Sequence, residues 1–445
     1  MIDLVLAAND AEAIKRELTS SDVEACAILY TTQTRRSDSK IRLLVRELEL
    51  ASDADYSRRG PLEAELLPAF VARVTKRARR EKYGLVFVHS HPGDDPPTFS
   101  PVDWRGEQQL AAFLAHRLPD PVHAALVMSR GGMQARCLGS KEGIRVVAVG
   151  SRRQVLSDPV GKTESKLSEV FDRQIRVFGP AAQRALEELR VAVVGLGGIG
   201  SLVAQELVHL GVRDFIIVDA DVLEASNLNR VAGATPNDLG RAKIEIAERY
   251  IRSVSANGSV VSIQGDVTKA STARALLNAD CICCCTDSHG SRAVVQQVAY
   301  QYLIPCIDMG TTIAVKESQI THIYGRVQLL APGLACLICN SLLDSSQVRR
   351  DMMTPFERQA DPYLQGAHEP APAVMSLNGT VGSLAVTMLL SVICGIPVSA
   401  RHLLYNALAS TLRSVRGQPN PQCFICSRSG AYGRGDTWPL PGRQD

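Results

Sequence analysis

The sequence predicts an α/β protein with two compact units. From about residue 167 onward, short apolar runs alternate with helical segments, a pattern typical of βαβ units and a largely parallel sheet. Residues 1–148 mix helical stretches with short β-type runs, which indicates a separate α/β unit. Residues 149–166 between them are polar and carry Gly and Pro, as linkers do. A length of 445 residues is sufficient for two or three such units.

Apolar spacing places the individual elements. In the first unit we expect helices at 11–18, 62–80 and 104–117, and strands at 84–89 and 122–128. In the second unit we expect strands at 191–194, 215–219, 260–264, 281–285 and 306–308. Residues 429–445 are rich in Gly and Pro, so the second unit should end near 428 and be followed by a flexible tail.

Composition and charge exclude several classes of protein. Hydrophobic residues make up 45% and charged residues 21%, as in ordinary globular proteins. The net charge of +3 is too small for a chain whose main partner is nucleic acid or an anionic membrane. The apolar stretch 381–397 is short for a membrane span and contains Gly, so it predicts a buried helix. Twelve Cys without a visible secretion signal predict reduced thiols or metal ligands in a cytoplasmic protein.

Two histidines lie at the end of one predicted strand. In the segment GLVFVHSHP, His89 and His91 are two residues apart, so both imidazoles project from the same face. Asp103, at the start of a predicted helix, can complete a site of two His and one carboxylate with a fourth position for water, as in catalytic zinc sites. A simpler interpretation stays open, because Ser100, Pro101 and Asp103 also form an ordinary helix N-cap.

Together with Glu24 in VEACAILY, these residues resemble the JAMM (MPN-plus) metalloprotease motif, over about the first 140 residues. The resemblance implies that His89, His91 and Asp103 bind zinc. It also implies that Glu24 is the general acid/base and that Ser100 helps to stabilise the oxyanion. The family typically hydrolyses peptide or isopeptide bonds after the C-terminal glycine of ubiquitin-like proteins. The loop before Ser100 is one residue longer here than in the family.

A glycine-rich loop predicts a nucleotide site in the second unit. The segment VVGLGGIG follows a predicted strand and opens a helix, with glycines at Gly195, Gly197, Gly198 and Gly200. Glycines allow phosphates to approach the backbone, and the helix N-terminus offers free N–H groups. Asp219 ends the next strand, where an acid binds ribose hydroxyls. These features alone also fit a nicotinamide-dependent dehydrogenase.

The residues around this loop favour an ATP-cleaving adenylyltransferase. Arg230 and Lys243 add positive charge beyond the ribose site, where negative charge grows on a departing pyrophosphate. From about 167 to 426 the chain closely resembles the ubiquitin-activating enzyme family in its MoeB/ThiF branch. The matching motifs are DRQI at 172–175, DAD at 219–221, NLNR at 227–230, GRAK at 240–243 and TD at 286–287.

The resemblance implies a role for each matching residue. The candidates for binding ribose and phosphates are Asp219, Asp221, Asn227, Arg230 and Lys243. Asp287 would bind magnesium and set the geometry of acyl transfer. Arg173 matches an arginine that reaches the ATP of the partner subunit, which implies a homodimer. Taken singly, each residue also has a structural explanation, as a strand-end cap or a surface ion pair.

Two C-x-x-C pairs predict a structural zinc site. The thiolates of Cys336, Cys339, Cys423 and Cys426 would form a closed tetrahedral site, as in many MoeB-like proteins. The Cys-rich run 281–285 fills a predicted strand, so we expect its thiols in the core. Conjugating members of the family carry a catalytic Cys between the two zinc pairs, but residues 340–377 contain none. Adenylation without a thioester is therefore the expected activity.

The expected protein is a bifunctional enzyme that uses ATP, magnesium and two zinc ions. Its first unit would cleave at the C-terminal glycine of a ubiquitin-like or sulfur-carrier protein, either to trim a precursor or to remove the protein from conjugates. Its second unit would adenylate that same glycine. Three outcomes stay open for these activities. A sulfurtransferase partner would turn the adenylate into a thiocarboxylate, whereas a conjugating enzyme would attach the carrier to a target. Alternatively, the first unit is a non-catalytic scaffold, in which case only one zinc ion would bind.

Overall fold

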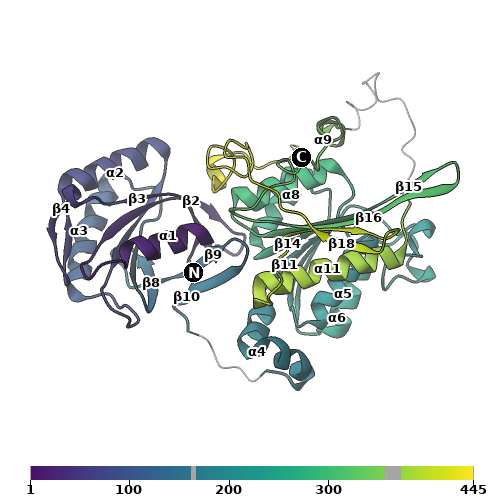
Figure 1. Ribbon diagram of the computed structural model, residues 1–445, viewed down its shortest axis with the longest axis horizontal. Coiled ribbons are helices and arrows are strands. Elements are labelled where there is room, and N and C mark those ends of the chain that lie inside the picture. The colour runs from purple at the N-terminus through teal and green to yellow at the C-terminus, as the bar shows by residue number, and fades with distance from the viewer. Residues whose placement is uncertain (1, 162–166, 355–356, 358–371, 444–445) are drawn as a thin grey trace. The chain divides into compact units, whose positions relative to one another are not determined.

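Figure 1 shows the computed structural model, which describes residues 2–161, 167–354, 357 and 372–443. The chain forms two compact units. The first comprises Met1–Ser165, Gln301–Leu303 and Ala431–Pro439, and the second comprises the remaining residues. Part of the expected linker (162–166), part of the Cys-free segment (355–356 and 358–371) and the end of the expected tail (444–445) lie outside the described residues.

In the first unit, one sheet has the strand order β1-β3-β2-β6-β7-β8-β9-β10, and β1 also pairs with β9, which joins distant parts of that order. The strands of this sheet are β1 (Ile2–Ala7), β2 (Cys26–Arg35), β3 (Ile41–Leu50), β6 (Gly84–Ser90), β7 (Ala124–Ser129), β8 (Gly132–Cys137), β9 (Gly143–Val149) and β10 (Arg153–Ser157). The helices are α1 (Ala8–Leu18), α2 (Pro68–Glu81) and α3 (Pro101–Arg117). Strands β4 (Tyr56–Arg59) and β5 (Ala64–Leu66) form a separate hairpin.

Strand β6 shows why the sequence folds this way. Val86 and Val88 point into one apolar core, whereas Leu85 and Phe87 point into a second core that contains side chains of α2 and α3. A strand that is buried on both faces has a continuous apolar sequence rather than an alternating one. The apolar run ends at His89, which is half-buried, whereas the next residue, Ser90, is still buried.

Two predictions about the first unit were wrong at the level of elements. The helix expected at 62–80 begins only at Pro68, because residues 64–66 pair with β4 as strand β5. The expected linker 149–166 contains strand β10, which pairs antiparallel with β9. In both cases long-range strand pairing takes residues that local patterns assign to a helix or a loop.

The prediction of a flexible tail was also wrong for Ala431–Pro439, which belongs to the first unit. Tyr432 is buried, and its carbonyl accepts a hydrogen bond from the Arg46 side chain. The Thr32 hydroxyl donates to the carbonyl of Gly433 at 2.6 Å. Gly433 has a φ of +60°, in the left-handed region that favours glycine. The glycines thus allow a tightly bent, packed segment.

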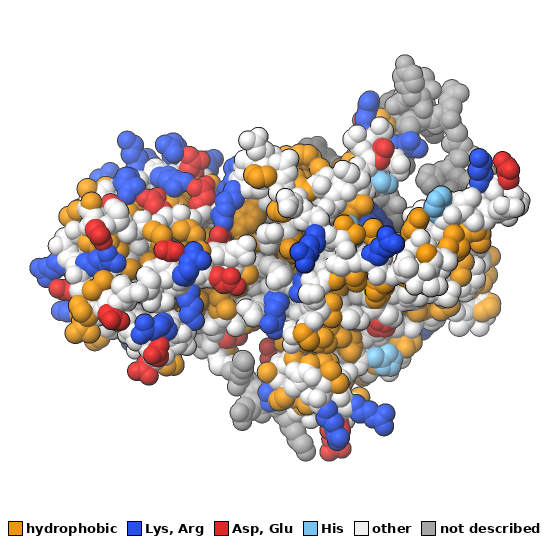
Figure 2. Space-filling model, in the orientation of Figure 1, with side chains coloured by type: hydrophobic (Ala, Val, Ile, Leu, Met, Phe, Trp, Pro, Cys, Tyr) orange, Lys and Arg blue, Asp and Glu red, His pale blue; other side chains and the backbone are white. Residues whose placement is uncertain are grey.

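Surface charges on the first unit are mixed. Figure 2 shows basic and acidic side chains interspersed over the visible face of this unit. Several of them pair, such as Arg73 with Asp55 at 3.2 Å and Arg77 with Glu49 at 3.5 Å. On the face that Figure 2 shows, the alternating signs leave no large area of one charge on this unit.

The second unit contains a sheet of order β13-β12-β11-β14-β15-β16-β17-β18. Its strands are β11 (Arg190–Val194), β12 (Asp214–Asp219), β13 (Ser259–Gln264), β14 (Cys281–Cys284), β15 (Cys306–Lys316), β16 (Gln319–Leu330), β17 (His402–Asn406) and β18 (Thr411–Ser414). The pairings from β13 to β15 are parallel, as expected. The antiparallel strands β16 to β18, and the extension of β15 beyond residue 308, were not predicted.

Helices cover both faces of this sheet. Figure 1 shows α5, α6 and α11 on one face and α8 on the other. The helices of the unit are α4 (Asp172–Glu187), α5 (Gly198–His209), α6 (Lys243–Val254), α7 (Ala270–Ala275), α8 (His289–Gln301), α9 (Ser345–Met352) and α11 (Met375–Cys394). Cys281 and Cys283 lie in the core under α5 and α11, which confirms the prediction for the Cys-rich strand.

Helix α11 contains most of the apolar stretch expected to be a buried helix. By length and mean hydropathy (1.7) it is apolar enough to cross a membrane, but 56% of its most apolar window is buried inside the protein. It packs against α5 and strands β15 and β16. Its apolar character is therefore explained by its place in the core of the second unit. The helix ends at Gly395, whose φ of +74° is a left-handed C-cap.

Candidate metal and nucleotide sites

Backbone pairing brings the first set of candidate residues together. Strand β6 pairs with β2, and in this register His89 lies opposite Cys26. Cys26 is two positions after Glu24, so the pairing brings Glu24 close to His89. The Ser90 hydroxyl accepts a hydrogen bond from the N–H of Ala25 at 3.0 Å, and the N–H of His91 donates to the carbonyl of Met128 at 2.8 Å. These bonds hold the end of β6 between β2 and β7, so that the two imidazoles and Glu24 face one point.

The distances fit a tetrahedral metal site. Nε2 of His89 lies 3.2 Å from Nε2 of His91 and 3.2 Å from Oδ1 of Asp103. Ligand atoms about 2.0–2.1 Å from one zinc ion would be about 3.3 Å apart in a tetrahedron. Oε1 of Glu24 lies 3.9 Å from Nε2 of His91, close to the group but outside the ligand cluster of two His and one Asp. The predicted ligands and the predicted base are thus brought together.

Asp103 also belongs to the N-cap of α3. The Ser100 hydroxyl accepts from the N–H of Asp103 at 3.1 Å, while the N–H of Ser100 donates to Oδ2 of Asp103 at 2.6 Å. The capping interpretation is therefore correct, and it coexists with the ligand cluster because Oδ1 of Asp103 faces His89. The capping box sets the direction in which the carboxylate points. The hydroxyl hydrogen of Ser100 is not used by this cap.

The two carboxylates differ in protonation. Burial raises the pKa of Glu24 to about 7, although the charge of His89 opposes the shift. Burial also tends to raise the pKa of Asp103, but the bonds to His89 and Ser100 outweigh it and hold that pKa well below its usual range. One acid is thus fully ionised, as a ligand must be, and the other is poised to exchange a proton near neutrality.

Arg136 supports this site from β8, and the sequence analysis did not identify it. The guanidinium of Arg136, on β8, lies 3.9 Å from the ring centre of Phe99 and 5.1 Å from that of Trp104. It also binds both carboxylate oxygens of Glu107 on α3, with the shortest distance at 2.8 Å. The ring of Phe99 in turn lies 6.2 Å from that of His89. No spacing in the sequence links β8 to the start of α3, so only packing reveals the group.

The glycine loop of the second unit has the shape expected for a phosphate-binding turn. Gly195 has a φ of +87°, and a Cβ placed there would lie 3.0 Å from the carbonyl of Cys285. A Cβ on Gly200 would lie 1.8 Å from the carbonyl oxygen of Gly195. Gly197 is the N-cap of α5, and Gly198 is the first residue of that helix. The loop therefore needs glycine at two positions for close packing, and it presents the N-terminus of α5.

Acidic and basic residues lie beside this loop. The carboxylate of Asp219, at the end of β12, accepts hydrogen bonds from the N–H groups of Leu196 and Asp221. Burial raises the pKa of Asp219, and the charge of Lys243 opposes the shift. Nζ of Lys243 binds Oδ2 of Asp221 at 2.7 Å. The structure brings these three predicted residues together, and their roles toward ribose and phosphate stay predictions.

The remaining predicted residues are distributed differently. Arg230 approaches Gly198, because a Cβ on that glycine would lie 3.4 Å from Cδ of Arg230. Its guanidinium donates to the Ser226 carbonyl and to the Asn229 side chain, and it forms no ion pair with a carboxylate in the described part of the chain. The amide of Asn227 is held by its neighbours, Glu224 N–H and Ser226 Oγ, both at 3.3 Å.

Two candidates project outward. Asp287 is exposed three residues after the end of β14. It lies at the same end of the sheet as the glycine loop that follows β11, since these strands are parallel neighbours. Arg173 is exposed in the first turn of α4, and no contact joins it to the glycine loop among the described residues. Its predicted action on a partner subunit stays a prediction.

A second residue that sequence reasoning missed lies over the glycine loop. Asn378, from α11, is 2% exposed, and a Cβ on Gly198 would lie 2.1 Å from its Nδ2. Its Oδ1 accepts a hydrogen bond from the Thr311 hydroxyl on β15 at 3.3 Å. Asn378 is 180 positions from Gly198 along the chain, and no motif of the glycine loop points to it.

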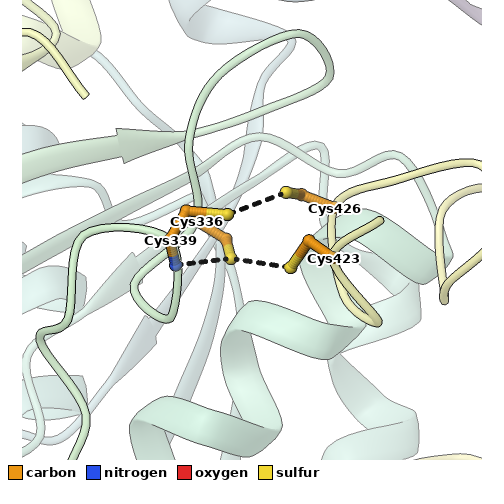
Figure 3. Close-up of side chains that lie close together, drawn as sticks. All are labelled: Cys336, Cys339, Cys423 and Cys426. Atoms are coloured by element: carbon orange, nitrogen blue, oxygen red, sulfur yellow. Dashed lines mark hydrogen bonds between the residues drawn. The ribbon is translucent and has the colours of Figure 1, made fainter. Parts of the chain in front are cut away.

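The four predicted zinc ligands of the second unit converge. Figure 3 shows the sulfur atoms of the two pairs facing one another, one pair from the loop after β16 and one from the segment after β18. The Sγ atoms of Cys336 and Cys423 lie 3.6 Å apart, and those of Cys339 and Cys426 lie 3.5 Å apart. Four sulfurs about 2.3 Å from zinc would be about 3.8 Å apart. A hydrogen bond from the thiol of Cys426 lowers the pKa of Cys336 to about 6, which favours the thiolate form of a ligand.

Parallel strands, a glycine loop leading into a helix and an acid at the end of the neighbouring strand define a Rossmann-like nucleotide-binding unit. The chain matches the model of the ThiF family over residues 171–425, which is more than half of its length. It therefore belongs to the ThiF family.

Curated relatives match the same part of the chain. The SAMP-activating enzyme E1 of Haloferax volcanii is 26% identical over 254 residues, which cover 57% of this chain and 85% of that protein. The molybdopterin-synthase adenylyltransferase of Escherichia coli K12 is 26% identical over 262 residues, covering 58% and 96%. Among solved structures, E. coli MccB with MccA-N7isoASN aligns with a TM-score of 0.48 at 19% identity, covering 59% of this chain and 76% of that one.

Proposed function

We propose that the second unit is an ATP-dependent adenylyltransferase that activates the C-terminal glycine of a ubiquitin-like or sulfur-carrier protein. The observation that carries the proposal is the pairing of a glycine loop with Arg230, a cation without a carboxylate partner among the described residues. Phosphates bind well at helix N-termini, and a nearby guanidinium adds charge-assisted hydrogen bonds. The printed names of the relatives, an activating enzyme and an adenylyltransferase, agree with this chemistry.

In the proposed reaction, one oxygen of the glycine carboxylate forms a bond to the α-phosphorus of ATP. The bond from that phosphorus to the bridging oxygen breaks, and pyrophosphate leaves with the electron pair. Arg230 and Lys243 would stabilise the charge that develops on the leaving group. Asp287 would hold magnesium, and Asp219 would orient the ribose. Because Lys243 is paired with Asp221 in the structure, we expect it to turn to the nucleotide when ATP binds.

We further propose that the first unit is a zinc metalloprotease of the JAMM type. The cluster of His89, His91 and Asp103 fits zinc in distance and in donor type, and zinc would serve there as a Lewis acid. Glu24 would take a proton from the attacking water and give it to the leaving amine, a task suited to its pKa of about 7. Cleavage after a glycine would expose the carboxylate that the second unit activates.

The test uses the full chain, because β10 and the segment 431–439 belong to the first unit and a fragment ending near residue 150 would lack them. Pyrophosphate exchange into ATP should appear only with a carrier whose C-terminal glycine is exposed. A carrier extended beyond that glycine should support exchange only after cleavage, and a chelator should block that step. Binding of a nicotinamide cofactor in place of ATP would overturn the adenylation proposal.

Three further points belong to the proposal. Because residues 340–377 contain no Cys, we favour release of the adenylate to a sulfurtransferase over thioester formation, and formation of a carrier thiocarboxylate would support this choice. If the first unit is instead a scaffold, the purified chain should contain one zinc ion rather than two.

A homodimer in which Arg173 serves the partner's ATP predicts that mixing an inactive Arg173→Ala chain with an inactive Asp287→Ala chain restores part of the exchange activity.

A further inference from the structure

The side chain of Asn378 is 2% exposed, and its amide nitrogen has no hydrogen-bond partner among the described residues. Its Oδ1 is engaged by the hydroxyl of Thr311, which orients the side chain so that Nδ2 faces Gly198. Nδ2 donates no hydrogen bond to another described residue, yet it is not fully sealed from solvent. An amide donor that has little access to solvent and no protein acceptor is usually satisfied by a ligand or by water. Nδ2 is aimed at the first residue of α5, where the glycine loop ends.

The order of the strands indicates which part of a substrate this donor would meet. An acyl-adenylate runs from ribose through phosphate to the acyl group. The predicted ribose ligand Asp219 ends β12, and the glycine loop follows its neighbour β11. Strand β14 comes next, and β15, which carries Thr311, lies beyond it. Asn378 is anchored to β15, so it lies on the side of the phosphate site away from the ribose, where the acyl group would be.

We propose that Asn378 is a substrate-binding residue that donates a hydrogen bond from Nδ2 to the carboxylate of the C-terminal glycine. This inference rests on the proposed adenylation activity. While one carboxylate oxygen attacks the α-phosphorus, the amide would hold the other, which becomes the carbonyl oxygen of the acyl-adenylate. A neutral amide suits this task because it orients the carboxylate without pairing with its charge as an Arg would. Thr311 would be a positioning residue that acts through Asn378.

The experiment measures equilibrium binding to the full chain of two probes, ATP and 5′-O-(glycylsulfamoyl)adenosine, a stable analogue of glycyl-adenylate. Asn378→Leu, which keeps the shape and removes the donor, should weaken binding of the glycyl analogue by about 3- to 10-fold, as expected for one lost hydrogen bond. Its Kd for ATP should stay within about 2-fold. Thr311→Val should shift the same ratio in the same direction by a smaller factor. Exposed Ser376→Ala, on the same helix, is the control.

The possible outcomes are distinct. Weaker binding of the glycyl analogue alone supports the proposal, and Thr311→Val gives the answer if Asn378→Leu does not fold. Equal weakening of ATP and the analogue overturns it, because the amide would then serve the phosphates or the fold. Unchanged binding of both probes also overturns it. If the unmodified chain binds neither probe, the adenylation proposal itself fails, and this inference fails with it.

Discussion

The two candidate sites share a local plan but present opposite chemistry. In the first unit, β6 ends at Ser90 and a loop leads to the N-cap of α3; in the second, β11 ends at Val194 and a loop leads to the N-cap of α5. The loop of the first unit is the longer one, and imidazole and carboxylate side chains gather at its two ends. His89 lies 3.2 Å from both His91 and Asp103, and His91 lies 3.9 Å from Glu24. The shorter loop of the second unit is made of glycines and exposes backbone.

The difference shows how one strand-loop-helix plan serves two kinds of ligand. In the first unit the start of the helix is already capped, because the side chains of Ser100 and Asp103 each accept a hydrogen bond from the other's backbone N–H. The carboxylate of Asp103 can then face a cation. In the second unit Gly197 caps α5 without a side chain, so the helix N-terminus is left for an anion. The residue at the cap and the third residue of the helix thus decide whether the helix start presents a carboxylate or free backbone N–H groups.

Removing the site formed by the four cysteines should produce the largest loss of stability. Cys339→Ser should cost roughly 4 kcal/mol or more of unfolding free energy, because the site joins segments that are 84 positions apart (339 to 423). Thermal melting with zinc analysis measures the effect. Cys394→Ser, which changes a thiol outside the cluster, is the control. Equal stability of the two variants would mean that the four cysteines hold no structural metal.

Substituting Arg230 should abolish most of the adenylation chemistry. Arg230→Ala should lower pyrophosphate exchange by about 10²- to 10³-fold, as for other groups that stabilise charge in a transition state. Asp287→Ala should have a similar effect. Arg252→Ala, on the exposed face of α6, should change the rate little. Cleavage by the first unit should be unchanged in all three variants; a parallel loss would show that the two sites are not independent.

Substituting Glu24 tests the cleavage chemistry proposed for the first unit. Glu24→Gln should lower cleavage by about 10²-fold, because it deletes the proton shuttle but leaves His89, His91 and Asp103 able to hold zinc. Turnover and zinc content are measured on the same preparation, with exposed Glu65→Gln as the control. Wild-type turnover in the Glu24 variant would reduce the cluster to a capped helix beside two histidines.

Deleting residues 431–445 should destabilise the first unit, whereas deleting only 440–445 should remove contacts of the second unit alone. A chain that lacks residues 431–445 loses the buried ring of Tyr432 and the bonds from Thr32 and Arg46, together worth about 2–4 kcal/mol. A chain that lacks only 440–445 keeps these contacts and serves as the control. Hydrogen exchange of β2 and β3 follows the effect, and we expect faster exchange only in the longer deletion.

The smallest expected effect concerns Arg136, whose guanidinium lies against the ring of Phe99. Arg136→Lys keeps the charge next to Glu107 but loses the planar stack between Phe99 and Trp104, so zinc affinity of the first site should fall by about 10-fold. Competition with a chromophoric chelator measures this affinity. Arg130→Lys, whose ion pair with Asp94 is exposed, should leave it unchanged. An equal change in both variants would reflect surface charge rather than the stack.

Local sequence patterns determined much of this protein. The glycine loop, the strands that flank it and the N-cap at Ser100 depend on residues within a few positions of one another, and each lies where the sequence predicts it. The apolar run that forms β6 likewise placed His89 at a strand end. Such features follow from backbone sterics and local burial, which operate over a few residues.

Only the tertiary structure decided the rest. It paired β10 with β9 inside an expected linker, extended β15 into an antiparallel sheet with β16, and packed Ala431–Pro439 into the first unit. It also placed Asn378 over Gly198 and Arg136 beneath Phe99. Each of these contacts either joins residues that are distant in sequence or depends on which strand pairs with the edge of the sheet. That choice is made by the packing of the whole unit, and no local period or motif records it.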